Sequence, residues 1–74
     1  MDELARLYGQ NIENGRRLLG LSQAQLAEII GVNQSSVAKW ESGENIPRDH
    51  HKVKLATALR QEVRHLFPLT GAVA

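Results

Sequence analysis

Residues 21–43 constrain the fold of this chain more than any other segment, because two helix signals follow each other closely there. Ser22 and Gln25 have the spacing of a capping box, in which each side chain satisfies a backbone N–H group at a helix start. Gly31 can take the left-handed conformation that ends such a helix. Asn33 is a favourable cap for a second helix, which the pattern ends at residues 42–43. The sequence therefore predicts two short helices joined by a very short turn.

Two helices joined so closely must cross at a steep angle, and the crossing restricts which residues can occupy the contact. A small residue is needed where the helices touch, and Ala27 supplies it. Gly31 supplies the positive φ that the turn requires. The positions that must be apolar are occupied by Leu26, Ile30, Val32, Val37 and Trp40. These constraints together predict a helix-turn-helix whose second helix runs from about Gln34 to Ser42.

The rest of the chain predicts three more helices and no strand. Apolar residues recur at three- and four-residue steps between Leu4 and Leu19, which predicts a first helix. Gly9 and Gly15 weaken that helix, and Gly15 is a place where another helix can cross it. A fourth helix is expected over roughly residues 48–59 and a fifth over about 62–66. On these three helices, the apolar residues expected to face the core are Leu4, Leu7, Tyr8, Ile12, Leu18, Leu19, Val53, Leu55, Ala56, Leu59, Val63 and Leu66.

The fold class expected is all-α, a compact bundle of five short helices that contains the helix-turn-helix. Residues 1–69 are expected to form one domain and residues 70–74 a disordered tail. The chain has no cysteine, so neither a disulfide nor a thiolate metal site stabilises it.

The outer face of the second motif helix is the candidate for DNA recognition. Once the inward positions are removed, the residues left facing outward are Gln34, Ser35, Ala38, Lys39 and Ser42. An α-helix fits the major groove, where glutamine can pair with adenine and lysine can donate to guanine. The two exposed helix starts also offer backbone N–H groups to phosphates. The alternative is that this face is simply solvated.

The segment LSQAQLAEIIGVNQSSVAKWESG (residues 21–43) resembles the phage repressor and Cro family of helix-turn-helix regulators, also called the Xre family. With PxxxxxxKLATAL at residues 47–59, the resemblance covers about residues 10–67. It implies a lambda-repressor-like fold of five short helices and base contacts from Gln34, Ser35 and Lys39. The phosphate contacts that the resemblance and the helix starts together suggest are those of Gln23, Ser42, Arg48, Ser22 and Asn33. The resemblance also implies an ion pair between Arg16 and Glu41, although Arg16 can alternatively reach a phosphate.

Four positions, in three places along the chain, depart from the family pattern. Gly15 stands where an aliphatic residue is usual, and Asp49 and Lys52 replace apolar residues in the fourth helix. Arg60 stands where a glycine commonly ends that helix. These departures concern the packing of the first and fourth helices and leave the motif untouched.

Several function classes are disfavoured. The net charge is only +1, from nine Lys and Arg against eight Asp and Glu, so charge alone leaves nucleic-acid binding open. No apolar run approaches the ~18 residues of a membrane span, and Asp2 and Glu3 do not fit a signal peptide. We therefore expect a cytoplasmic protein with no membrane partner. His50 and His51 lack further nearby ligands, and no catalytic constellation is evident, so no metal, cofactor, small-molecule substrate or enzymatic activity is expected.

The sequence thus predicts a sequence-specific transcriptional regulator whose partner is a double-stranded DNA operator. Apolar surface from Val63, Leu66, Phe67 and Leu69 is expected to support a homodimer through the C-terminal helix. A monomer on a single half-site is the alternative to that dimer. A second function class is a protein-interaction module on the same fold, such as an antitoxin or adaptor, because a fold alone does not determine function.

Overall fold

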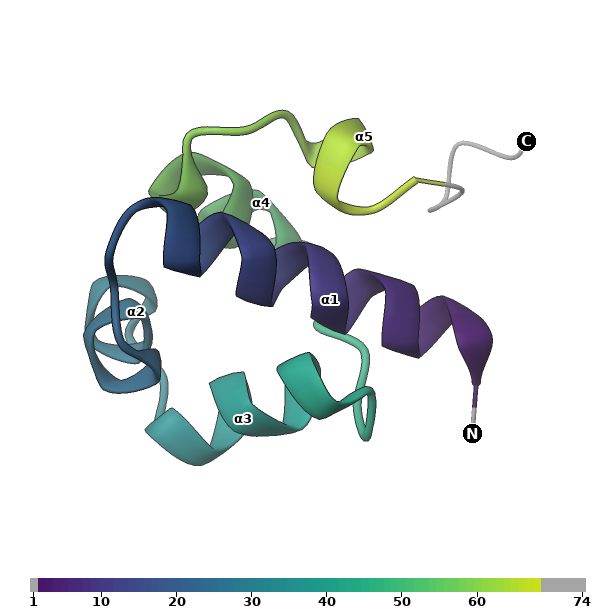
Figure 1. Ribbon diagram of the computed structural model, residues 1–74, viewed down its shortest axis with the longest axis horizontal. Coiled ribbons are helices and arrows are strands. Elements are labelled where there is room, and N and C mark those ends of the chain that lie inside the picture. Colours follow the sequence, from purple (N-terminus) through teal and green to yellow (C-terminus); the bar gives the residue numbers. More distant parts are fainter. Residues whose placement is uncertain (1, 69–74) are drawn as a thin grey trace.

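A computed structural model describes residues 2–68, and the regular secondary structure within that range is helical, with no strand. The helices are α1 (Glu3–Leu18), α2 (Gln23–Ile30), α3 (Gln34–Ser42), α4 (Asp49–Leu59) and α5 (Val63–Leu66) (Figure 1). The predicted all-α bundle of five short helices is therefore confirmed. The predicted tail at residues 70–74 and Leu69 lie outside the described residues. None of the helices within residues 2–68 is long and apolar enough to cross a lipid bilayer.

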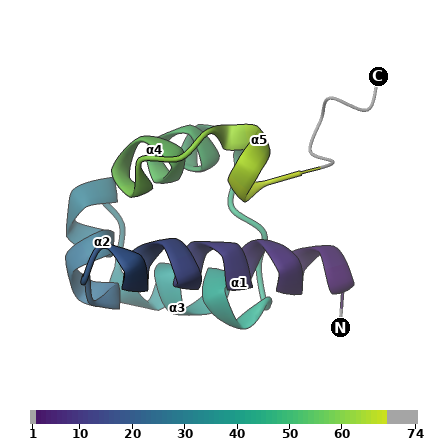
Figure 2. The ribbon, with the colours of Figure 1, turned by 45° about the horizontal axis from the view of Figure 1, so that its top comes forward.

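Helix α1 runs through the middle of the molecule, with α3 and α5 on opposite sides of it (Figures 1 and 2). The buried core joins all five helices and consists of Tyr8, Ile12, Leu26, Ala27, Ile30, Val37, Trp40, Leu55, Ala56, Leu59, Leu66 and Phe67. Edge-to-face packing of Tyr8 and Phe67, with ring centroids 5.2 Å apart, fixes α5 against α1. The Tyr8 hydroxyl also donates to the Pro68 carbonyl at 2.7 Å. This end of the core is thus closed by contacts between residues distant in sequence.

The predicted inward face of α4 was wrong at one position. Val53 is 55% exposed, whereas the neighbouring Lys52 is buried. The buried residues of α4 are Lys52, Leu55, Ala56 and Leu59, which have the i, i+3, i+4, i+7 spacing of a single helical face. The Lys52 ammonium lies 3.6 Å from the Asp49 carboxylate, and it also lies 5.5 Å from the centroid of the Tyr8 ring. The lysine stem therefore fills the apolar position while its charged end keeps polar and aromatic partners.

The predicted inward face of α1 was also wrong at Leu7, Leu18 and Leu19. Leu18 is 83% exposed, and Leu7 and Leu19 are each about two-fifths exposed. The buried face of α1 instead passes through Ala5, Tyr8, Gly9, Ile12, Gly15 and Arg16. Leu18 follows Arg16 by two residues, which places it about 200° around the helix from that side chain.

The two glycines of α1 lie where other elements approach it most closely. A methyl group on Gly9 would lie 2.3 Å from the Trp40 carbonyl oxygen, so α3 crosses α1 at this point. A methyl group on Gly15 would instead meet the side chains of Gln61, at 2.8 Å, and Leu59, at 3.4 Å. The closest helix crossing of α1 is therefore at Gly9, and Gly15 faces the end of α4 and the residues that follow it.

Two expectations about the C-terminal helix changed. Leu66 and Phe67 are fully buried, so the prediction that they offer apolar surface was wrong. Val63 is only partly buried and packs at the edge of the core. Because α5 is a single short turn packed onto α1, its large side chains are needed to complete the core of this small domain.

Candidate nucleic-acid interface

Both ends of α2, and the turn that leads to α3, are built by residues close together in sequence. The Ser22 hydroxyl accepts from the Gln25 N–H at 3.0 Å, and the Gln25 side chain accepts from the Ser22 N–H at 2.8 Å. Gly31 has φ 87° and donates to the Ala27 carbonyl at 2.8 Å, ending α2. Val32 donates to the same carbonyl at 3.0 Å. The predicted capping box and left-handed glycine are both confirmed.

Helix α3 has one buried and one exposed face. Val37 and Trp40 are buried in the core, whereas Gln34, Ser35 and Lys39 are exposed. Gly43, at φ 83°, ends the helix in the left-handed conformation. The three residues predicted to contact bases thus share the outer face, held in place by the two anchors beneath them.

The start of α2 leaves unpaired donors pointing out of the helix. The capping box uses the N–H groups of Ser22 and Gln25. The N–H groups of Gln23 and Ala24 have no intrahelical acceptor, because they belong to the first turn. The positive end of the helix dipole adds to their attraction for an anion.

The start of α3 differs in one respect from the prediction. Asn33 occupies the cap position, but its side chain makes no capping hydrogen bond. The expectation that it caps through its side chain was therefore wrong. Ser36 donates its N–H to the Asn33 carbonyl at 3.0 Å, so the first-turn N–H groups left without an intrahelical acceptor are those of Gln34 and Ser35.

A polar network connects α1 with both helices of the motif. Arg16 Nε lies 2.6 Å from Glu41 Oε2, and Arg16 Nη2 donates to Glu41 Oε1 at 3.0 Å. Arg16 Nη1 donates to the Leu21 carbonyl at 2.8 Å. The hydrogen bond with Glu41 raises the pKa of Arg16, against the opposing effect of its burial. The guanidinium is thus occupied within the protein rather than directed toward an external phosphate.

Gln23 belongs to the same network. Its Nε2 donates to Glu41 Oε1 at 2.9 Å, which ties the first residue of α2 to the end of α3. Sequence reasoning assigned Gln23 to phosphate and missed this bond, because nothing in the local spacing relates residues 23 and 41. One N–H of the amide and the backbone N–H of Gln23 remain as donors.

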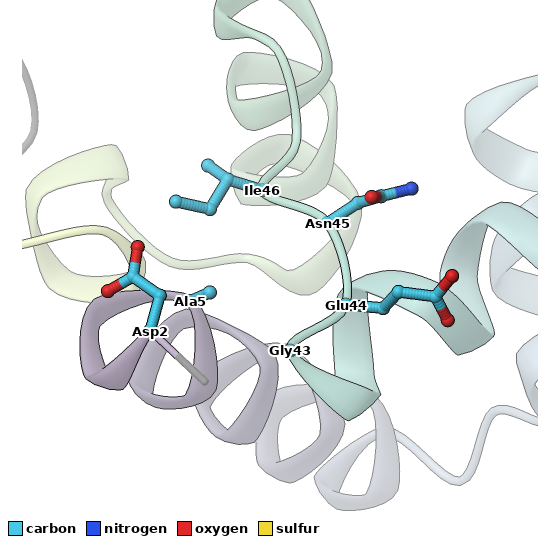
Figure 3. A pocket seen from close by; sticks show the side chains of 6 residues that line it. All are labelled: Asp2, Ala5, Gly43, Glu44, Asn45 and Ile46. Carbon is cyan, nitrogen blue, oxygen red and sulfur yellow. The ribbon is translucent and has the colours of Figure 1, made fainter.

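Ser42 is exposed at the other end of α3, but its hydroxyl is engaged locally. It donates to the Lys39 carbonyl at 3.1 Å and accepts from the Glu44 N–H at 3.3 Å. A phosphate contact from Ser42 therefore requires its hydroxyl to turn away from the helix end. The following loop, residues 43–46, passes beside the first turns of α1 (Figure 3).

Basic side chains gather at the start of α4. Arg48 is exposed at the cap position. The His51 ring packs 5.2 Å from Trp40 and 4.0 Å from His50, measured between centroids. Burial, together with the charges of His50, Lys54 and Arg48, lowers the pKa of His51. Within the part of the chain that the structure describes, no three His, Cys, Asp or Glu residues are grouped to hold a metal ion.

Ion pairing separates the cations into two sets. Arg16, Arg17, Lys52 and Arg64 pair with carboxylates. Within residues 2–68 the cations that form no ion pair are Arg6, Lys39, Arg48, Lys54 and Arg60. Lys39 and Arg48, both on the candidate interface, thus carry charges that no carboxylate offsets. The small net charge conceals this uneven distribution.

The model of a helix-turn-helix family matches residues 12–66 of the chain, which include the C-terminal part of α1, the whole motif, and all of α4 and α5. The chain belongs to the helix-turn-helix family. This helix-turn-helix protein is 37% identical over 57 residues to the cryptic phage CTXphi transcriptional repressor RstR of Vibrio cholerae, covering 77% of this chain and 51% of the relative. It is 31% identical over 55 residues to repressor protein C2 of Salmonella phage P22, covering 74% of this chain and 26% of the relative. The predicted resemblance to phage repressors is confirmed, although the chain spans only about half of RstR and a quarter of C2.

Solved structures agree with this assignment. The restriction-modification controller protein C.AhdI from Aeromonas hydrophila is similar to this helix-turn-helix protein with a TM-score of 0.80 and 38% identity, covering 85% of this chain and 96% of C.AhdI. The P22 c2 repressor, solved in complex with synthetic operator 9T, gives a TM-score of 0.81 and 29% identity, covering 84% of this chain and 94% of that chain. The helix-turn-helix and the bundle that supports it are therefore shared along nearly the whole described chain.

Proposed function

We propose that this chain is a transcriptional regulator that binds operator DNA by placing α3 in the major groove. The observation that carries the proposal is the division of α3 into two faces. Val37 and Trp40 fix the helix to the core, and the exposed face presents hydrogen-bonding side chains and an unpaired cation. The operator in the similar P22 c2 structure, and the repressor names of the related proteins, support the same conclusion.

Base recognition is assigned to Gln34, Ser35 and Lys39. A glutamine amide can form paired hydrogen bonds with adenine, and a lysine ammonium can donate to the acceptors of guanine. Ser35 and Lys39 are separated by one helical turn, so their side chains reach neighbouring positions in the groove. The specificity of this small surface therefore depends on few side chains, and each should account for a separate base preference.

Phosphate contacts fix the position of the helix in the groove. The free N–H groups at the start of α2, where Ser22 and Gln23 lie, are suited to binding a phosphate of one DNA strand. Asn33 and Ser42 border the outer face of α3, and Arg48 extends the basic surface to the start of α4. The Glu41–Gln23 hydrogen bond holds the start of α2 in a fixed place relative to α3. Phosphate contacts carry no base information but determine register.

A homodimer would place two α3 helices about one DNA turn, roughly 34 Å, apart on a palindromic site. Since Leu66 and Phe67 are buried, a dimer formed near α5 requires other exposed apolar side chains. Leu18 and Leu19 are the best candidates, because they line a surface hollow together with Glu62 and His65. A consensus site with two-fold symmetry would support the dimer, and a single half-site would exclude it as the DNA-binding form.

The experiment that tests the function is selection of preferred duplexes from a random pool, followed by titration at several salt concentrations. Binding should weaken with salt, with a slope of log K against log [salt] of about −0.9 for each phosphate contacted. A reproducible consensus should emerge from the selected pool. Absence of binding to duplex DNA at low salt would overturn the proposal.

A further inference from the structure

Arg6 is an exposed cation on the second turn of α1, outside the residues assigned to the interface. It makes no ion pair with any residue in the range 2–68. The helix-turn-helix match begins at Ile12, so Arg6 also lies outside the segment that the family model covers. Neither the core nor an ion pair explains its charge.

The stem of Arg6 packs against the point where α3 ends. A methyl group on Gly43 would lie 3.0 Å from Arg6 Cγ and 3.2 Å from Arg6 Cα. The absence of a side chain at residue 43 therefore allows α1 and the end of α3 to approach closely. A stem held in this way loses little further conformational freedom when the guanidinium binds a ligand.

The surface beside this contact is a polar hollow lined by Arg6, Gln10, Glu13, Glu41 and Ser42. Its two carboxylates are already paired. Glu41 binds Arg16 at 2.6 Å, and Glu13 binds Arg17 at 2.7 Å. Arg6 is the cation that lines this hollow, and it pairs with neither carboxylate. Ser42, which also lines the hollow, stands at the edge of the outer face of α3.

The acidic residue of the loop that follows Gly43 is turned away from α1 (Figure 3). Figure 3 shows Glu44 and Asn45 pointing away from α1, whereas Ile46 turns over its first turn near Asp2 and Ala5. The carboxylate of Glu44 is therefore directed away from the helix that carries Arg6.

From this placement we infer that Arg6 contacts a DNA phosphate next to the C-terminal end of α3, so that α1 contributes to the DNA interface. The inference rests on the proposed function. It adds a contact at the end of α3 opposite to the helix start at Asn33, which lengthens the protein surface along one strand. An arginine suits this role because its planar guanidinium can donate two parallel hydrogen bonds to phosphate oxygens.

The test compares Arg6→Gln with Arg64→Gln, which removes the same charge from α5, on the side of α1 opposite to α3. Both variants and the parent chain are titrated with a random-sequence duplex over a range of salt concentrations, after circular dichroism has established that they fold. Arg6→Gln should lower the affinity roughly tenfold at low salt and reduce the magnitude of the salt slope by about 0.9. Arg64→Gln should change the affinity less than about twofold.

A second measurement locates the contact on the DNA. Neutral methylphosphonates are introduced one at a time along a duplex that the parent chain prefers. At one flanking phosphate the parent chain should lose affinity and Arg6→Gln should lose none. Equal effects of Arg6→Gln and Arg64→Gln, or equal sensitivity of the parent chain and Arg6→Gln at every phosphate, would overturn the inference. If the parent chain does not bind duplex DNA at all, the proposed function itself fails.

Discussion

The helix-turn-helix, residues 22–43, and the second half of the domain, residues 48–67, follow local sequence rules to different degrees. In the motif, Ser22 begins a complete capping box, and Gly31 and Gly43 end the two helices in the left-handed conformation that glycine favours. In the second half, Arg48 caps no N–H group with its side chain, and Arg60 takes the left-handed conformation without being glycine. The motif is therefore specified by neighbours in sequence, and the second half depends on distant contacts that outweigh local preferences.

Loss of Glu41 should have the largest effect, because it would leave the motif without the network that ties it to α1. Its side chain is only 5% exposed, and that of Arg16 only 11%. Glu41→Ala should lower the free energy of unfolding by about 3–5 kcal/mol, since a buried guanidinium loses its partner. Denaturant unfolding measures the change. Glu62→Ala, which breaks the exposed pair with Arg64 in the second half, should cost less than about 1 kcal/mol; an equal cost for both would contradict the account.

Alanine substitutions at the two glycines of α1 compare its contact with the motif, at Gly9, with its contact with the second half of the domain, at Gly15. Gly9→Ala should destabilise by about 3 kcal/mol, because the added methyl group meets the backbone of α3. Gly15→Ala should be neutral or stabilising by up to about 1 kcal/mol, because the end of the flexible Gln61 side chain can move and alanine favours a helix. Thermal and denaturant unfolding of both variants give the comparison. A similar effect at both positions would mean that α3 does not cross α1 at Gly9.

Two residues with left-handed backbone conformation, Arg60 and Gly31, should respond to substitution in opposite directions: glycine should stabilise the first position and alanine should destabilise the second. Arg60→Gly should stabilise the domain by about 1 kcal/mol, because it relieves a conformation unfavourable for a residue with a Cβ atom. Gly31→Ala should destabilise by about 1 kcal/mol, through backbone conformation alone, since nothing lies within 4 Å of the added methyl group. Unfolding free energies measure both. Destabilisation by Arg60→Gly would show that the arginine side chain contributes to the junction more than its backbone costs.

The smallest effect expected is a pH dependence from His51, which connects the two regions through its contact with Trp40. Burial lowers the pKa of His51 in the folded chain, so as the pH falls the unfolded chain binds a proton first. Stability should therefore fall between about pH 7.5 and about pH 5.5, around the ordinary histidine pKa. Melting temperatures measure the slope. His51→Gln should reduce this slope, and an unchanged slope in His51→Gln would contradict this assignment.

The sequence predicted the motif in detail because its signals are local. The capping box, the left-handed Gly31 and the apolar positions around Val37 and Trp40 all act within a few residues. Elsewhere the spacing of the apolar residues predicted the buried face of a helix incorrectly. Val53 was expected in the core, but the buried face of α4 carries Leu55, Ala56 and Leu59, and residue 52 lies on that face. The Lys52 ammonium is accommodated there 5.5 Å from the centroid of the Tyr8 ring.

The candidate site was only partly predictable for the same reason. The outer face of α3 follows from the anchors on its inner face, so its residues could be read from the helical period. The bond between Gln23 and Glu41, and the packing of Arg6 against Gly43, join residues far apart in sequence. No spacing rule relates such pairs, and only the packed structure brings them together.

The central claim is that the outer face of α3 reads base sequence, and Lys39→Ala tests it most directly. The affinities of the parent chain and the variant are measured for the selected duplex and for a set of its single-base-pair changes. Because Lys39 is exposed and makes no ion pair within the described chain, its loss should leave the fold intact. If the outer face of α3 reads base sequence, the variant should lose about 1–3 kcal/mol of discrimination at one base pair and keep it elsewhere. Equal weakening on every duplex, or no change at all, would contradict it.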